Sequence, residues 1–209
     1  MKKNLPLILS GIIVLILGAY LLNAKQTSTT PSQLSPSPSA SSQQFLTVTP
    51  DMETLERGGS SYTHPQNLYT FLYPNNYKLD APEDGMITRI YMQGATQRGQ
   101  TELYDGALFV VEAIDLKGQT LNDFVNERIS VSTADGTSQI IEEKKSTMLN
   151  VYPGFTFKMR GLGEATYLFL QKDTTSTSAI GITYSVFDPE MKNYQEDINA
   201  VLNSFEIHK

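Results

Sequence analysis

The chain has 209 residues, of which 40% are apolar, enough for one folded domain with a packed core. It contains no cysteine, which excludes disulfides, thiolate zinc sites, a cysteine nucleophile and a lipid-modified cysteine anchor. Residues 51–209 hold all 22 acidic side chains and 13 basic ones, a net charge of −9. So acidic a domain repels phosphate backbones, and we expect no nucleic acid among its partners.

Residues 5–24 are predicted to form a transmembrane signal-anchor helix. The stretch Leu5–Leu22 is uncharged and apolar, and at 1.5 Å per residue it spans about 27 Å, close to the hydrocarbon thickness of a bilayer. Two lysines precede it, which places residues 1–4 in the cytoplasm and the rest of the chain outside. The alternative is a signal peptide cleaved after Ala24, which would release a secreted domain.

Residues 25–50 are predicted to be a disordered stalk. This stretch is rich in Ser, Thr, Pro and Gln, and it cannot bury enough apolar surface to offset the entropy of ordering. The repeated "SPSPS" stiffens it locally toward polyproline II. Such a stalk would hold the folded domain, predicted over 51–209, a few tens of ångströms from the membrane.

Most of residues 51–209 shows the alternation of apolar and polar residues that is typical of strands. Strands are expected over 68–73, 86–93, 107–116, 139–145, 154–160, 165–172 and 179–187. Between the third and fourth, Leu121, Phe124, Val125 and Ile129 share one helical face, and Thr120 is placed to cap that helix.

A second helix is expected to close the chain. Asp188 can cap it and Pro189 suits its first turn. Its apolar stripe is interpreted as a core face: Met191, Tyr194, Ile198, Val201, Leu202 and Phe205. Strands joined by short turns favour an antiparallel sheet, and the apolar faces of the two helices must be buried against it. The sequence therefore predicts an α+β fold in which helices flank an antiparallel sheet as an α/β/α sandwich.

The stretch "NLYTFLYPNNYKL" is predicted to be a core hairpin. Tyr69, Phe71 and Tyr73 alternate with residues that are also largely apolar, as expected for a strand covered on both faces. Pro74 ends the strand, and the two asparagines that follow favour a turn.

Three short motifs resemble the PsbP-like superfamily, which includes an extrinsic protein of photosystem II and many bacterial extracytoplasmic domains. They are "LYTFLYPNNYKL", the helix start "TLNDFV" and the ending "INAVLNSFEI", which together bracket Tyr62–Ile207. The resemblance implies an antiparallel sheet between helices. It implies no single activity, since members are mostly non-catalytic accessory or binding proteins.

No set of residues in the sequence indicates catalysis. The two histidines, His64 and His208, are expected in an exposed loop and an exposed tail, and neither accompanies a Gly-x-Ser-x-Gly elbow. Asp80, Glu83 and Asp84 gather in one turn, where carboxylate oxygens could hold a hard cation such as calcium. A solvated acidic turn is the alternative, and no cofactor is expected.

We therefore expect a non-enzymatic, membrane-anchored domain outside the cytoplasm that binds or supports a protein partner of the cell envelope. Two alternatives are an extracytoplasmic hydrolase that uses carboxylates brought together by the fold, and a ligand sensor that acts through a membrane partner. The sequence leaves the oligomeric state open.

Overall fold

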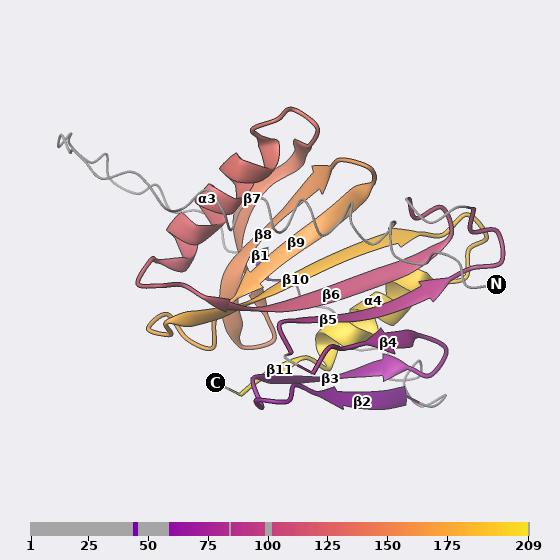
Figure 1. Ribbon diagram of the computed structural model, residues 1–209, viewed down its shortest axis with the longest axis horizontal. Coiled ribbons are helices and arrows are strands. Elements are labelled where there is room, and N and C mark those ends of the chain that lie inside the picture. Colours follow the sequence, from indigo (N-terminus) through magenta and orange to yellow (C-terminus); the bar gives the residue numbers. More distant parts are fainter. Residues whose placement is uncertain (1–43, 46–58, 84, 99–101, 209) are drawn as a thin grey trace, which may run out of the picture. The chain divides into compact units, whose positions relative to one another are not determined.

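The computed structural model describes residues 44–45, 59–83, 85–98 and 102–208 (Figure 1). The chain divides into two units, Met1–Ser42 and Gln43–Lys209, and every described residue belongs to the second. The predicted membrane helix and nearly all of the predicted stalk thus lie outside the described residues. Within the described ranges, no helix is long and apolar enough to span a membrane.

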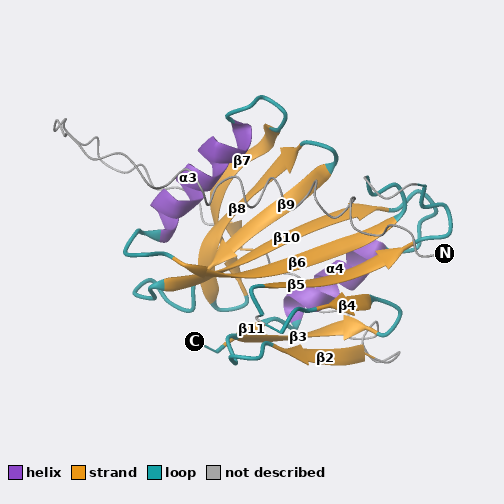
Figure 2. Cartoon of the chain, viewed as in Figure 1, coloured by secondary structure: helices purple, strands orange, loops and turns teal. Residues whose placement is uncertain are grey.

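The larger of two sheets has eight strands in the order β1-β7-β8-β9-β10-β6-β5-β4 (Figure 2). Its neighbours are antiparallel, as predicted, except that β1 runs parallel to β7. The strands are β1 (Gln44–Phe45), β4 (Lys78–Asp80), β5 (Ile87–Gln93), β6 (Gly106–Asp115), β7 (Gln139–Leu149), β8 (Tyr152–Arg160), β9 (Glu164–Leu170) and β10 (Ser178–Phe187).

A second sheet, which was not predicted, has the order β11-β3-β2. Its strands are β2 (Gly59–Thr63), β3 (Tyr69–Pro74) and β11 (Glu206–Ile207). The expected hairpin after β3 is wrong, because β3 pairs with β2 and β11 whereas β4 pairs with β5. The turn at Asn75 and Asn76 passes the chain from one sheet to the other.

Two helices complete the described fold, α3 (Leu121–Thr133) and α4 (Tyr194–Asn203). The predicted cap of α3 is confirmed, since the Thr120 hydroxyl accepts a hydrogen bond of 3.1 Å from the backbone N–H of Asp123. Helix α4 begins later than predicted, after a loop over residues 188–193.

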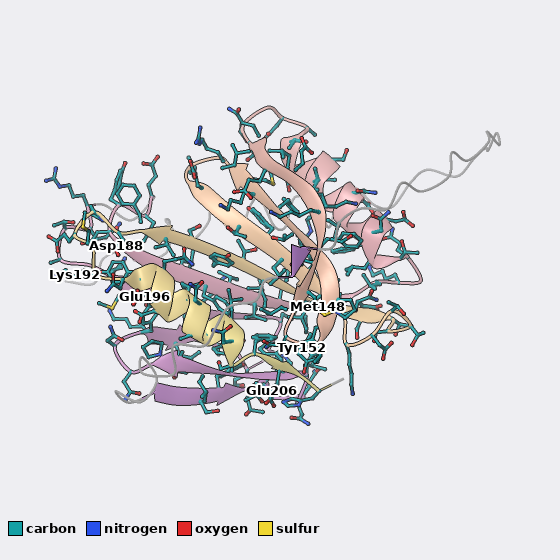
Figure 3. All side chains as sticks on the ribbon, turned by 180° about the vertical axis from the view of Figure 1, so that it is seen from behind. Met148, Tyr152, Asp188, Lys192, Glu196 and Glu206 are labelled. Carbon is teal, nitrogen blue, oxygen red and sulfur yellow. The ribbon has the colours of Figure 1, made fainter. Side chains whose placement is uncertain are left out.

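The two helices lie on opposite faces of the larger sheet (Figures 1 and 3). Alternate residues of β9 show this: Leu168 and Leu170 join the core beneath α4, and Phe169 joins the core beneath α3. The α4 side also receives the smaller sheet, whose Tyr69 and Phe71 are fully buried. The α+β prediction is therefore confirmed, with the smaller sheet added to one of its helical layers.

Three local predictions were wrong. Leu72 is 39% exposed, so β3 is covered on one face. Met191 is 86% exposed and stands apart from the buried stripe of α4. "YPG" opens strand β8, and the turn before it is formed by Asn150 and Val151.

Candidate binding surface

Two loops meet at one end of the larger sheet: described residues 94–98 and 102–105, between β5 and β6, and residues 188–193, between β10 and α4. We call these loops, together with Phe187 at the end of β10, the loop end. The strand register brings them together, because Gly106 pairs with Gln93 on one side and with Phe187 on the other. Figure 1 shows both loops leaving the same end of the sheet.

A fully buried carboxylate, that of Asp105, holds the first loop in shape. Its Oδ2 accepts hydrogen bonds from the backbone N–H and the hydroxyl of Thr96, at 2.9 and 2.8 Å. These bonds from Thr96 hold the pKa of Asp105 below its ordinary value. The side-chain oxygen of Gln97 accepts from the N–H groups of Tyr104 and Asp105, at 2.9 Å each. The carboxylate lies where a Cβ at Gly94 would be, so this position requires glycine.

Tyr194 joins this loop to helix α4. Burial raises the pKa of Tyr194, and the neighbouring Asp105 carboxylate raises it further, so the phenol keeps its proton beside the charged group. The buried side chain at the first position of α4 thus fixes the helix start against the β5–β6 loop.

The second loop is held by one carboxylate, that of Asp188. It accepts three backbone N–H groups, from Lys192 at 2.7 Å, from Asn193 at 2.8 Å and from Tyr194 at 3.3 Å. Met191 and Asn193 have left-handed backbones, with φ of 55° and 65°. Methionine seldom adopts this conformation, whose strain is on the order of 1 kcal/mol or more. The loop is therefore preorganised in a shape that its own sequence does not favour.

Three large apolar side chains are exposed at the loop end. Met191 is 86% exposed, Phe187 49% and Tyr104 45%. The Tyr104 hydroxyl donates to the carboxylate of Glu102, which fixes its ring direction. Exposed charges of both signs lie nearby: Lys192 pairs with Glu190 at 3.3 Å, and Arg98 is exposed on the first loop. The strand register brings these three exposed apolar side chains to the same end of the sheet, which makes this end a candidate interaction site.

The predicted acidic turn is only partly described. The carboxylate of Asp80 pairs with the Arg89 guanidinium at 3.1 Å, Glu83 is exposed and Asp84 lies outside the described residues. Among the described residues, no three His, Cys, Asp or Glu side chains are placed to hold a metal ion. The cation site remains a prediction.

The expectation of an exposed His64 is wrong, because its side chain is 2% exposed. The backbone N–H of Gln66 donates to its Nδ1 at 3.1 Å, so its Nε2 donates to the carbonyl of Gly85, 2.8 Å away. His208 is half-buried, with Nε2 2.9 Å from the Thr70 hydroxyl. Both histidines therefore have structural contacts: His64 connects to Gly85, and His208 connects the C-terminal end of the chain to Thr70 in β3.

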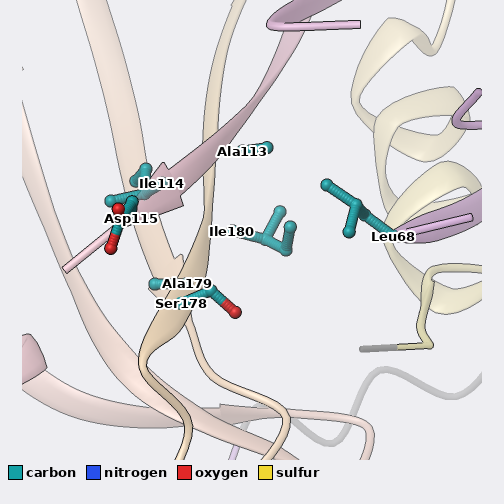
Figure 4. A pocket seen from close by; sticks show the side chains of 7 residues that line it. All are labelled: Leu68, Ala113, Ile114, Asp115, Ser178, Ala179 and Ile180. Carbon is teal, nitrogen blue, oxygen red and sulfur yellow. The ribbon is translucent and has the colours of Figure 1, made fainter. Parts of the chain in front are cut away.

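A small hollow of about 250 Å³ lies at the opposite end of β6 and β10 from the loop end (Figure 4). It is lined by Leu68, Ala113, Ile114, Asp115, Ser178, Ala179 and Ile180. Its single carboxylate, on Asp115, accepts the N–H of Lys117 at 2.9 Å. This lining offers neither a histidine nor a second carboxylate, so it gives the hydrolase alternative no acid–base pair.

No protein-family model and no curated protein matches this sequence. The solution structure of cyanobacterial PsbP (CyanoP) from Synechocystis sp. PCC 6803 matches with a TM-score of 0.47 and 12% identity, over 72% of this chain and 92% of that one. The Saccharomyces cerevisiae Ran-binding protein Mog1p matches with a TM-score of 0.46 and 8% identity, over 72% and 95%. The first of these is a PsbP protein, the kind of protein that the sequence motifs resemble. Similarity at this level says nothing about what this chain binds.

Proposed function

We propose that this protein is a non-enzymatic binding domain that engages a protein partner through its loop end. The observation that carries the proposal is Met191, an apolar side chain held out into solvent on a strained backbone. Within this chain the exposed side chain gains no hydrophobic free energy to offset the backbone strain, whereas burial in a partner would supply it.

Hydrogen bonds within the described parts of the loops support the same conclusion. Asp105 and Asp188 hold these parts through charged hydrogen bonds, which reduces the conformational entropy that they lose on binding. Methionine and aromatic side chains are the anchors that protein interfaces favour.

In this proposal the N-terminal segment anchors the domain to the outer side of a membrane. The support is the apolar stretch within residues 5–24, followed by the Ser/Thr/Pro-rich residues 25–50. Protease added to intact cells is expected to cut the stalk and release the folded domain. A domain that resists cleavage until the cells are lysed would contradict this topology.

Site-specific photo-cross-linking tests the binding surface. A photo-reactive residue in place of Met191 is expected to give a discrete cross-linked product in intact cells. The same residue at Val151 is the matched control, because Val151 is 72% exposed in the β7–β8 turn, where the neighbouring Asn150 contacts the carbonyl of Asn203 at the far end of α4. Figure 3 shows the separation, with Asp188 and Lys192 at one end of α4 and Tyr152 at the other.

A double substitution, Tyr104→Ser with Phe187→Ser, is expected to abolish the product at position 191 and to leave the melting temperature within a few degrees, since both side chains are about half exposed. Equal products from positions 191 and 151, or no product at 191, would count against the loop end as the binding surface.

A further inference from the structure

The outer edges of the larger sheet carry features that prevent unwanted strand pairing. Strand β4 has three residues, of which Lys78 and Asp80 are charged. Strand β7 carries "EEKK" at residues 142–145, its pairing with β8 shifts register twice between residues 140 and 145, and β1 covers its last part. Short length, charge and bulges are the usual ways in which proteins protect an edge.

Strand β2, which with the two-residue β11 forms the outer edges of the smaller sheet, has none of these features. Its sequence "GSSYT" contains no charge and no proline, and its register with β3 is continuous from Gly59 to Thr63. Within the part of the chain that the structure describes, no strand pairs with its outer side.

The hydrogen-bond pattern shows which residues face that edge. The N–H of His64 donates to the carbonyl of Tyr69 at 3.0 Å, so residues 64, 62 and 60 bond to β3. Backbone groups alternate along an antiparallel strand, and those of Ser61 and Thr63 therefore point away from β3. The side chains of Ser61 and Thr63 are also exposed, whereas Tyr62 is buried.

We infer that β2 pairs with β2 of a second copy of this chain. An antiparallel pair centred on Ser61 places Ser61 opposite its own counterpart and Gly59 opposite Thr63, so no charge meets a like charge. The same surface then serves both copies, as a twofold interface requires, and the two three-stranded sheets become one sheet of six. Peptide strands from other proteins use edges in the same way, but the lack of charge on β2 makes it complementary to itself.

A cysteine at position 61 tests the pairing directly, because the chain has no other cysteine. Because the backbone groups of Ser61 face the partner, the two copies of Ser61 form a hydrogen-bonded pair with Cβ atoms about 5.5 Å apart, which is long for a disulfide but within reach of a short thiol cross-linker. With the full chain in detergent micelles, Ser61→Cys is expected to give a covalent dimer with a short bismaleimide cross-linker. Val151→Cys, at an exposed position outside β2, is expected to form no covalent dimer and controls for random collision.

A charge at the same position supplies the opposite test. Ser61→Lys places two ammonium groups across the twofold axis and is expected to raise the dimer dissociation constant at least tenfold, with an unchanged circular dichroism spectrum. A monomeric wild-type chain at every concentration, measured by sedimentation, would overturn the inference. A dimer that survives Ser61→Lys would overturn it too, because the contact would then lie elsewhere. Neither result bears on the loop end.

Discussion

His64 connects the smaller sheet to the acidic turn before β5. Its ring lies 4.9 Å from the ring of Tyr69, centroid to centroid, and its two nitrogens bond to Gln66 and Gly85. A buried polar ring of this kind is stable only while both nitrogens keep their partners. The position of Gly85 is equally restricted, because a Cβ there would lie 2.5 Å from Nε2 of His64.

We predict that Gly85→Ala destabilises the protein more than Gly118→Ala. Both glycines have left-handed backbones, with φ of 65° and 83°, but no atom lies within 4 Å of a Cβ at Gly118. Gly118→Ala therefore measures backbone strain alone, about 1–2 kcal/mol. Gly85→Ala also displaces His64 from its hydrogen bonds, which adds about 1–3 kcal/mol. Urea unfolding of the two variants gives the comparison, and equal losses would show that His64 does not hold the turn.

Among the elements, helix α3 depends on its cap. The Thr120 hydroxyl satisfies one of the free N–H groups of the first turn, and Asp123 lies at the positive end of the helix dipole. Thr120→Ala is expected to lower the free energy of unfolding by about 1 kcal/mol. Thr133→Ala, at the last position of the same helix, is expected to be neutral or slightly stabilising, since alanine has the higher helix propensity. Denaturant unfolding measures both, and a similar loss for the two variants would argue against a specific cap.

Elements specified by neighbouring residues were predictable. Helix α3 is an example, because its cap and its apolar spacing both lie within thirteen consecutive residues, Leu121–Thr133, and the residue before them. The smaller sheet was not predictable, since β2 and β11 are short and β11 pairs with β3 across most of the domain, Glu206 with Thr70. Local sequence carries no signal for such a distant pairing.

The loop end escaped prediction for the same physical reason. The apolar spacing of α4 extends back to Met191, so sequence periodicity placed that residue in the core. In the structure the Asp188 carboxylate accepts hydrogen bonds from the backbone N–H groups of residues 192–194. These bonds hold the loop before α4, so the helix begins only at Tyr194. The buried carboxylate of Asp105 interacts with Thr96, which is near in sequence, and with Tyr194, which lies on the distant helix α4. Its place in the structure could therefore not be predicted from neighbouring residues.

At the scale of the whole molecule, buried tyrosines make the stability of the fold depend on pH in the alkaline range. Burial is the main cause that raises the pKa of five of them: Tyr69, Tyr77, Tyr167, Tyr184 and Tyr194. Above pH 10.0, the ordinary pKa of tyrosine, the unfolded chain releases these protons while the folded chain keeps them. The stability that these groups contribute is complete below pH 10 and is lost as the pH rises through and beyond that value.

We predict that the free energy of unfolding falls above pH 10 by up to about 1.4 kcal/mol per pH unit for each buried tyrosine. Urea unfolding between about pH 8 and pH 11.5 measures the slope, and tyrosinate absorbance reports when the phenols ionise. Tyr77→Phe is the sharpest variant, because Tyr77 is 4% exposed and the Asp197 carboxylate adds to the effect of burial on its pKa. In this variant the free energy of unfolding should fall less steeply with pH, and the difference should equal the contribution of one buried tyrosine. If the free energy of unfolding falls equally steeply in the variant and the wild type, Tyr77 ionises in the folded state as freely as in the unfolded chain.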